Sequence, residues 1–141
     1  MERLIKPLPR IILIIGSASQ RETDSMLMLF NEAFPDGGMF RAWFRPHPQN
    51  PWRETFDRIR STPEDMRIEV MTGEISEQLN KAWIVVGGES GLTVDALAFG
   101  CEVVSPVLND CMFQSPLGGH EEYYHKVYGP KEFREKILSL I

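Results

Sequence analysis

The stretch that decides the fold reads Trp83-Ile-Val-Val-Gly-Gly-Glu-Ser-Gly-Leu-Thr-Val-Asp-Ala-Leu-Ala-Phe-Gly100 and continues as Cys101-Glu-Val-Val-Ser-Pro106. Its opening residues are apolar and mostly β-branched, which is typical of a strand buried on both faces. A glycine pair ends that strand, and the run from Leu92 to Phe99 predicts a buried helix with Ser90 as its N-cap. Gly100 ends the helix before the next apolar strand. The pattern is therefore strand, glycine-rich turn, helix, strand.

This glycine-rich turn has the properties of an anion site. The first backbone N–H groups of a helix lack internal partners, and the helix dipole places partial positive charge there. Gly87, Gly88 and Gly91 have no Cβ, so a phosphate could approach their backbone closely, and the Ser90 hydroxyl could donate to it. A purely structural interpretation fits equally well, in which Ser90 caps the helix and the glycines form a tight turn.

Length, charge and cysteine usage exclude several classes of protein. The 141 residues can build one domain with a full core, and the net charge of −5 argues against a nucleic-acid partner. The chain has no apolar run of transmembrane length, and residues 1–9 lack the apolar core of a signal peptide. Cys101 and Cys111 lack metal-ligand spacing, so we expect reduced thiols in a cytoplasmic protein, with a disulfide as the alternative.

Strands and helices alternate along the rest of the chain. Interior strands are predicted at 11–15, 40–44, 83–86 and 102–105, and an edge strand at 67–71, where polar and apolar residues alternate. Helices are predicted from a cap at Thr23, Asp24 or Ser25 to about Phe34, and over 52–61, 74–81, 92–99 and 130–141. Right-handed crossovers then predict an α/β fold, a Rossmann-like three-layer domain with helices on both faces of a parallel sheet. The expected strand order is 3-2-1-4-5.

Two more loops carry polar groups at the carboxyl ends of strands. Gly16 and Ser17 follow the first strand, and the proline-rich loop 45–51 follows the second. In that loop Arg45 can grip a phosphate with two hydrogen bonds, and His47 can donate to phosphate or ribose or act as an acid. The alternatives are a surface arginine and a histidine stacked on a tryptophan. Because ligands of open α/β sheets bind where the strand order reverses, we expect all three loops to flank one crevice.

The run from Ser90 to Gly100, followed by Val103-Val104, resembles the donor-binding half of GT-B glycosyltransferases and of the related UDP-N-acetylglucosamine 2-epimerases. Those families carry a Ser-Gly-rich turn, then a helix with an acidic residue before Ala-Leu-Ala-x-Gly, then an apolar strand. The Gly16–Ser17 loop is also similar. The pair His47-Pro48 resembles bacterial sialyltransferase-like and polyglycerol-phosphate transferase-like branches, whose His contacts the nucleotide phosphate. The resemblance implies that residues 1–141 form a single domain, one half of a two-domain enzyme.

The resemblance also implies a role for individual residues. Ser90, Gly91 and Leu92 would meet the phosphates of a nucleotide. Asp95 stands where the family has a Glu that binds the ribose hydroxyls, and its shorter side chain leaves that contact, or the identity of the nucleotide or sugar, open. His47 is the candidate catalytic group, because with Arg45 it would stabilise the leaving phosphate. The full set of candidate binding residues is Gly16, Ser17, Arg45, His47, Gly88, Glu89, Ser90, Gly91, Leu92 and Asp95.

The predicted function is that of the nucleotide-sugar donor-binding domain of a glycosyltransferase in surface-polysaccharide synthesis. The donor would be a UDP- or CMP-linked sugar, and the absence of an Asp-x-Asp motif leads us to expect neither metal nor cofactor. An amino-terminal acceptor domain or a partner subunit would supply the catalytic base, so the chain alone would bind without turnover, and this partner could hold a cytoplasmic chain at the inner membrane. The alternatives are an epimerase-like enzyme and a non-catalytic partner subunit with a ligand-free fold.

Overall fold

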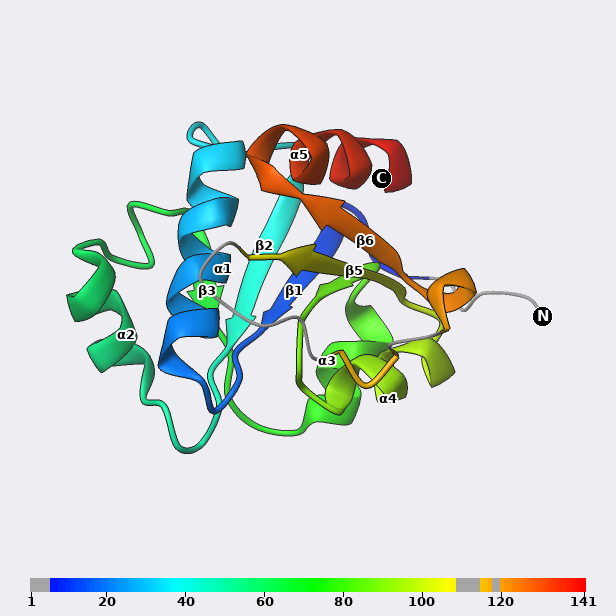
Figure 1. Ribbon diagram of the computed structural model, residues 1–141, viewed down its shortest axis with the longest axis horizontal. Helices are drawn as coiled ribbons and strands as arrows, with labels where there is room; N and C mark the ends of the chain where they lie inside the picture. The colour runs from blue at the N-terminus through cyan, green and yellow to red at the C-terminus, as the bar shows by residue number, and fades with distance from the viewer. Residues whose placement is uncertain (1–5, 109–114, 118–119) are drawn as a thin grey trace.

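The computed structural model describes residues 6–108, 115–117 and 120–141. A parallel sheet of six strands runs through its centre in the order β3-β2-β1-β4-β5-β6 (Figure 1). The strands are β1 (Arg10–Ile15), β2 (Phe40–Arg45), β3 (Ile68–Val70), β4 (Ile84–Val86), β5 (Glu102–Val107) and β6 (His125–Tyr128). The sheet confirms the predicted α/β class, and its order extends the predicted one by a single strand.

Helices cover both faces of this sheet, as the sequence predicts. They are α1 (Gln20–Ala33), α2 (Trp52–Ile59), α3 (Ile75–Lys81), α4 (Leu92–Ala98) and α5 (Gly129–Leu140), with a short 3-10 turn at Glu121–Tyr123. Helices α1, α2 and α5 contribute to one hydrophobic cluster, and α3 and α4 to the other. Figure 1 shows the same separation, with α5 above the sheet and α3 and α4 below it.

Strand β1 lies at the centre of the domain. Its side chains alternate between the faces, so that Ile12 and Ile14 join the cluster under α1 and α5, whereas Ile11, Leu13 and Ile15 join the cluster under α3 and α4. All five are at most 2% exposed. A continuous β-branched and leucine run is therefore required here, because both faces of the strand are covered by helices.

The sixth strand resolves a conflict in the strand order that the sequence predicts. The run 102–105 is apolar enough for the interior, yet an order of 3-2-1-4-5 places it at an edge. Strand β6 pairs with β5 from Val104 opposite His125 to Val107 opposite Tyr128, so β5 is indeed internal. Strand β3 occupies an edge as predicted.

Helix α1 begins earlier than the sequence analysis predicts. The capping residue is Ser19, whose hydroxyl accepts a hydrogen bond from the Glu22 N–H at 3.1 Å. The prediction of Thr23, Asp24 or Ser25 as the cap is therefore wrong. Thr23 lies inside the first turn, where its hydroxyl donates to the Ser19 carbonyl at 3.0 Å. The pattern Ser-x-x-Glu at 19–22 is a capping-box signal that marks the correct start.

Lys6 is buried at the opposite edge of the sheet from the strand ends that carry the polar loops. Its ammonium group donates to the carbonyl oxygens of Leu79, Ala82 and Phe99 at 3.0, 2.7 and 2.9 Å. These carbonyls end helices α3 and α4, where the helix dipoles place partial negative charge, so a cation is stabilised there. Cys101, a buried thiol, lies 3.5 Å from the Lys6 nitrogen, and Cys111 lies outside the described residues.

Candidate functional site

A cavity of about 450 Å³ opens at the carboxyl edge of the sheet. It lies among the loops that follow β1, β2 and β4, together with the start of α3, and so brings together the three loops that the sequence analysis expects at one crevice. The candidate binding residues on its wall are Gly16, Arg45, His47, Ser90, Gly91, Leu92 and Asp95. Four apolar residues that were not among the candidate binding residues complete the wall: Ile15, Pro46, Pro48 and Ile75.

Gly16 allows the first two of these loops to pass close to one another. Its N–H donates to the Arg45 carbonyl at 2.9 Å. A Cβ at this position would lie 3.2 Å from the Phe44 ring and 3.3 Å from both the Arg45 oxygen and the His47 nitrogen. A side chain here would therefore push the two loops apart.

The guanidinium group of Arg45 is held through one of its three nitrogens. Its Nη1 donates to the Gly73 carbonyl at 2.8 Å and to the Gln78 side-chain oxygen at 3.2 Å. Across the described ranges we find no partner for its Nε and Nη2 atoms. Arg45 is thus a cation on the cavity wall with donors still available. Gln78 and Gly73 were not identified by the sequence analysis, because nothing in their spacing links α3 to the end of β2.

His47 presents a hydrogen-bond donor. Its Nδ1 accepts a hydrogen bond from the Gln49 N–H at 3.0 Å, so the neutral ring carries its proton on Nε2. The loop itself is braced by Asn50, which is 1% exposed and accepts from Arg58 Nη2 at 3.0 Å. Arg58 in turn donates to both carboxylate oxygens of Asp24 on α1. The proline-rich loop is therefore fixed on the fold.

The start of α4 offers fewer amide hydrogens than its sequence suggests. The N-cap of α4 is Gly91, in the helical conformation, so the prediction of Ser90 as the N-cap is wrong by one position. The Ser90 hydroxyl nevertheless accepts a hydrogen bond from the first helical N–H, that of Leu92, at 3.2 Å. In the described part of the chain, the backbone N–H groups of Ser90 and Gly91 have no partner. A Cβ at Gly91 would meet nothing within 4 Å, so its backbone borders open space.

The glycine pair before this helix contacts a carboxyl group of the protein itself. A Cβ on Gly88 would lie 2.7 Å from a carboxyl oxygen of Glu22, and the same oxygen accepts from the Glu89 N–H at 3.2 Å. A Cβ on Gly87 would lie 2.9 Å from Thr93. Neither Gly88 nor Glu89 lines the cavity. The absence of a Cβ at these two positions therefore serves internal packing, and only Gly91 borders open space.

Burial changes the acidity of Glu22. The side chain is only 5% exposed, and desolvation raises the pKa of its carboxyl group above the ordinary 4.5. The negative charge of Glu89 raises this pKa further, whereas hydrogen bonds from the Glu89 N–H and the Ser17 side chain oppose the rise. Ser17 does not line the cavity: it is 2% exposed, and its hydroxyl oxygen lies 3.3 Å from the Ser19 carbonyl oxygen.

Asp95 is the one carboxylate on the cavity wall within the residues that can be described. It is exposed and belongs to the first turn of α4. The apolar side chains of Pro46, Pro48 and Ile75 line the same cavity. The wall thus combines hydrogen-bond donors, one carboxylate and an apolar surface, a composition found in sites for polar small molecules.

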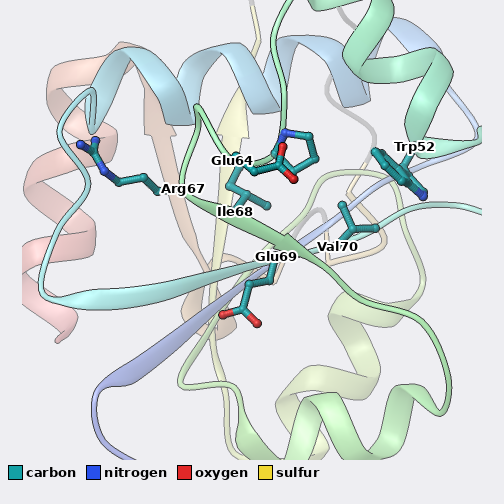
Figure 2. A pocket seen from close by; sticks show the side chains of 7 residues that line it. Trp52, Glu64, Arg67, Ile68, Glu69 and Val70 are labelled. Carbon is teal, nitrogen blue, oxygen red and sulfur yellow. The ribbon is translucent and has the colours of Figure 1, made fainter.

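A second cavity, of about 440 Å³, lies at the free edge of β3 and contains none of the candidate residues. Figure 2 shows that the side chains of Arg67 and Glu69 extend away from one another there. Arg67 donates to the Pro35 carbonyl at 3.0 Å, and Glu69 pairs with Arg41 at 2.7 Å. Its charged groups do not converge on a common point, so this cavity carries no recognisable chemistry.

Among the residues that the structure describes, no three His, Cys, Asp or Glu side chains gather closely enough to hold a metal ion. In the same part of the chain, every helix is too short or too polar to cross a bilayer.

The fold was compared with known proteins. No family model matches the chain, and no curated protein matches its sequence. Among solved structures, the chain is similar to S. aureus MnaA in a structure with UDP, with 15% identity over 93% of this chain and 36% of that one, at a TM-score of 0.64. It is also similar to the C-terminal domain of LpcC, a group 1 glycosyl transferase family protein from Francisella tularensis, with 15% identity over 96% of this chain and 76% of that one, at a TM-score of 0.61.

A third similar structure is the UDP-GlcNAc 2-epimerase from Neisseria meningitidis bound to UDP-GlcNAc. The identity is 16% over 96% of this chain and 36% of that one, at a TM-score of 0.59. The chain therefore spans about a third of the length of MnaA and of this epimerase. At such identities the likeness concerns the fold, and the resemblance inferred from the sequence is confirmed at that level. The chain has the fold shared by the C-terminal domain of a glycosyl transferase and by part of a UDP-GlcNAc 2-epimerase.

Proposed function

We propose that this chain is the nucleotide-sugar donor-binding domain of a glycosyltransferase that builds surface polysaccharide. The observation that carries the proposal is the convergence of three separate loops on one cavity, whose wall includes residues with hydrogen-bond donors that the described protein does not use. These donors are the Nε and Nη2 groups of Arg45, the Nε2 of His47 and the backbone N–H groups of Ser90 and Gly91. Such a set suits the oxygens of a diphosphate or phosphate.

The proposed chemistry is stabilisation of the leaving group. When the bond between the sugar and the phosphate breaks, negative charge grows on the departing phosphate oxygens. Arg45 supplies a positive charge and His47 an N–H group, and hydrogen bonds within the protein hold both side chains before the nucleotide sugar binds, so little reorganisation is needed as charge develops. Asp95 can accept hydrogen bonds from sugar or ribose hydroxyls, which is the role that the resemblance assigns to its position. None of these steps requires a metal.

Sugar transfer also requires an acceptor and a base. We infer that these come from an amino-terminal acceptor domain or from a partner subunit, because the chain covers 36% of the MnaA and epimerase chains that share its fold. The chain alone would then bind the donor without turnover. A cytoplasmic location, with attachment to the inner membrane through that partner, belongs to the same proposal.

The proposal is tested by nucleotide binding. A thermal-shift screen against UDP, CMP, CDP and GDP identifies the base, and calorimetry on the best nucleotide gives its affinity. Replacing Ser90 and His47 together by Ala removes a hydroxyl group and an imidazole donor from the cavity wall, so the affinity is expected to fall at least tenfold, a loss of about 1.4 kcal/mol.

A matched control replaces a serine and a histidine outside the cavity, Ser76 and His120, by Ala. Both residues are exposed, and their removal should leave the affinity unchanged. If no nucleotide stabilises the wild-type chain, the non-catalytic partner subunit becomes the better interpretation. An unchanged affinity in the Ser90 and His47 double variant would place the nucleotide elsewhere.

An epimerase-like activity is the second candidate, favoured by the fold shared with the Neisseria meningitidis epimerase. Such a reaction removes and returns a proton on the sugar, so it needs acid and base groups around the sugar ring. Only Asp95 supplies a carboxylate to the described cavity wall. Incubation with UDP-GlcNAc in deuterated water decides the matter, because an epimerase would introduce deuterium at the epimerised carbon.

A further inference from the structure

Arg45 is anchored by groups from a different part of the chain. It ends β2, yet both oxygens that accept from its Nη1 belong to the segment that follows β3. One is the carbonyl of Gly73, whose φ of +94° is a conformation that other residues rarely adopt. The other is the side-chain oxygen of Gln78 on α3. Two oxygen atoms therefore hold the guanidinium group, and both accept hydrogen bonds from the same nitrogen, Nη1.

Gln78 is itself immobilised. It is 3% exposed, and its amide nitrogen donates to the Thr72 carbonyl at 3.0 Å while its oxygen accepts from Arg45. A buried amide with both ends bonded has one favourable orientation, because turning it over would bring donor against donor. This orientation keeps the side-chain oxygen of Gln78 directed at Nη1 of Arg45.

The way in which Arg45 is held decides which of its edges remains available. With Nη1 occupied, the edge formed by Nε and Nη2 is left, and two parallel N–H groups on this edge match two oxygens of a phosphate or carboxylate. The same chain contains such a contact. Arg58 uses its Nε and Nη2 atoms to donate to the two oxygens of Asp24 at 2.8 and 3.0 Å.

We infer that Gln78 is a positioning residue for phosphate recognition: it holds Nη1 of Arg45 so that the Nε and Nη2 edge is preorganised to grip a nucleotide phosphate. This inference rests on the proposed function for its ligand, but the restraint on Arg45 is a property of the unliganded protein. Gln78 would act through Arg45 and not by touching the nucleotide, since it is absent from the cavity wall.

A double-mutant cycle separates positioning from a general structural role. Calorimetry measures UDP affinity for the wild type, Gln78→Ala, Arg45→Ala and the double variant. Gln78→Ala is expected to weaken UDP binding roughly tenfold, and to have no further effect once Arg45 has been removed. Uridine, which lacks phosphate, should bind the wild type and Gln78→Ala equally. Asn80→Ala, an exposed change on the same helix, is the matched control and should leave UDP affinity unchanged.

A second measurement needs no ligand. The NMR order parameter of the Arg45 Nε–H bond should be high in the wild type, fall clearly in Gln78→Ala, and recover in Gln78→Glu, which keeps an acceptor for Nη1. If Gln78→Ala does not fold, Gln78→Met takes its place in both measurements, because it preserves the side-chain volume.

The outcomes distinguish the inference from the proposed function. Equal losses of UDP affinity with and without Arg45, or an order parameter that does not change in Gln78→Ala, would overturn the positioning role while leaving the nucleotide site intact. A wild-type chain that binds no nucleotide would overturn the proposed function and the phosphate part of the inference. In that case the order parameter alone would still decide whether Gln78 restrains Arg45.

Discussion

The buried carboxyl group of Glu22 links the first and fourth helices of the domain. It lies on α1, and it holds the turn before α4 by accepting from the Glu89 N–H, 67 residues later in the sequence. Gly88 has no side chain that would displace this carboxyl group. No spacing rule could reveal such a contact, because the two residues are brought together only by the sheet between them. The same holds for Gln78 and Arg45.

The raised pKa of Glu22 predicts a particular dependence of stability on pH. Between the ordinary pKa of 4.5 and the raised value, the folded state binds the proton more strongly than the unfolded state does. The contribution of Glu22 to stability is therefore fully present below pH 4.5 and is lost as the pH rises through the folded-state pKa. Glu22→Gln keeps a side-chain oxygen for the Glu89 N–H, so it should stabilise the protein at pH 7 relative to the wild type, by about 1.4 kcal/mol for each unit by which the pKa is raised.

Urea unfolding of both proteins across this range measures the difference. The control is Glu89→Gln, which removes a neighbouring negative charge that helps to raise the pKa of Glu22. In this variant the pKa of Glu22 should lie closer to 4.5, so stability should be lost over a narrower pH range than in the wild type. A wild type that gains stability relative to Glu22→Gln as the pH rises would contradict the argument.

Helix α1 shows which features of an element the sequence reveals and which it hides. Its end near Phe34 was predicted from the sequence, whereas its start was misplaced because three candidate caps follow the true one. Strand β6 was missed for a different reason. It has only four residues, His-Lys-Val-Tyr, and only Val127 is fully buried, so neither an apolar run nor a clear alternation marks it. Short edge strands are defined by their neighbours more than by their own residues.

The cap of α1 gives a prediction at this scale. Ser19→Ala removes the acceptor of the Glu22 N–H and should destabilise the protein by about 1 kcal/mol. Ser25→Ala, at one of the positions first expected to cap, lies inside the helix and should be neutral or gain up to about 0.5 kcal/mol, because Ala is the better helix former. Urea midpoints at constant slope measure both changes. A larger loss of stability from Ser25→Ala than from Ser19→Ala would favour Ser25 as the helix cap.

For the whole molecule, the architecture follows from sequence rules more completely than the site does. Apolar runs separated by helices require a parallel sheet, and the carboxyl ends of its strands bring distant loops to one edge. That rule is enough to predict that Gly16, Arg45 and Ser90 would meet, as they do. It does not say which donors are used internally. The Leu92 N–H and one nitrogen of Arg45 are bonded within the protein, which depends on side-chain conformations in three dimensions.

The buried ammonium group of Lys6 can report when the domain opens, because its reactivity depends on its exposure. An amine that donates to three backbone carbonyls and is 5% exposed reacts with an acetylating reagent only after its contacts with the ends of α3 and α4 have opened. Exposed amines such as those of Lys81 and Lys131 should be modified first, and Lys6 only at the rate of unfolding, which mass spectrometry of the peptides can follow. Acetylation of Lys6 as fast as that of Lys81 would mean that these contacts of Lys6 are already open in the native state. If acetylation of Lys6 is slow, its rate can be compared with and without a ligand in the distant cavity, to show whether the ligand changes the opening of the domain.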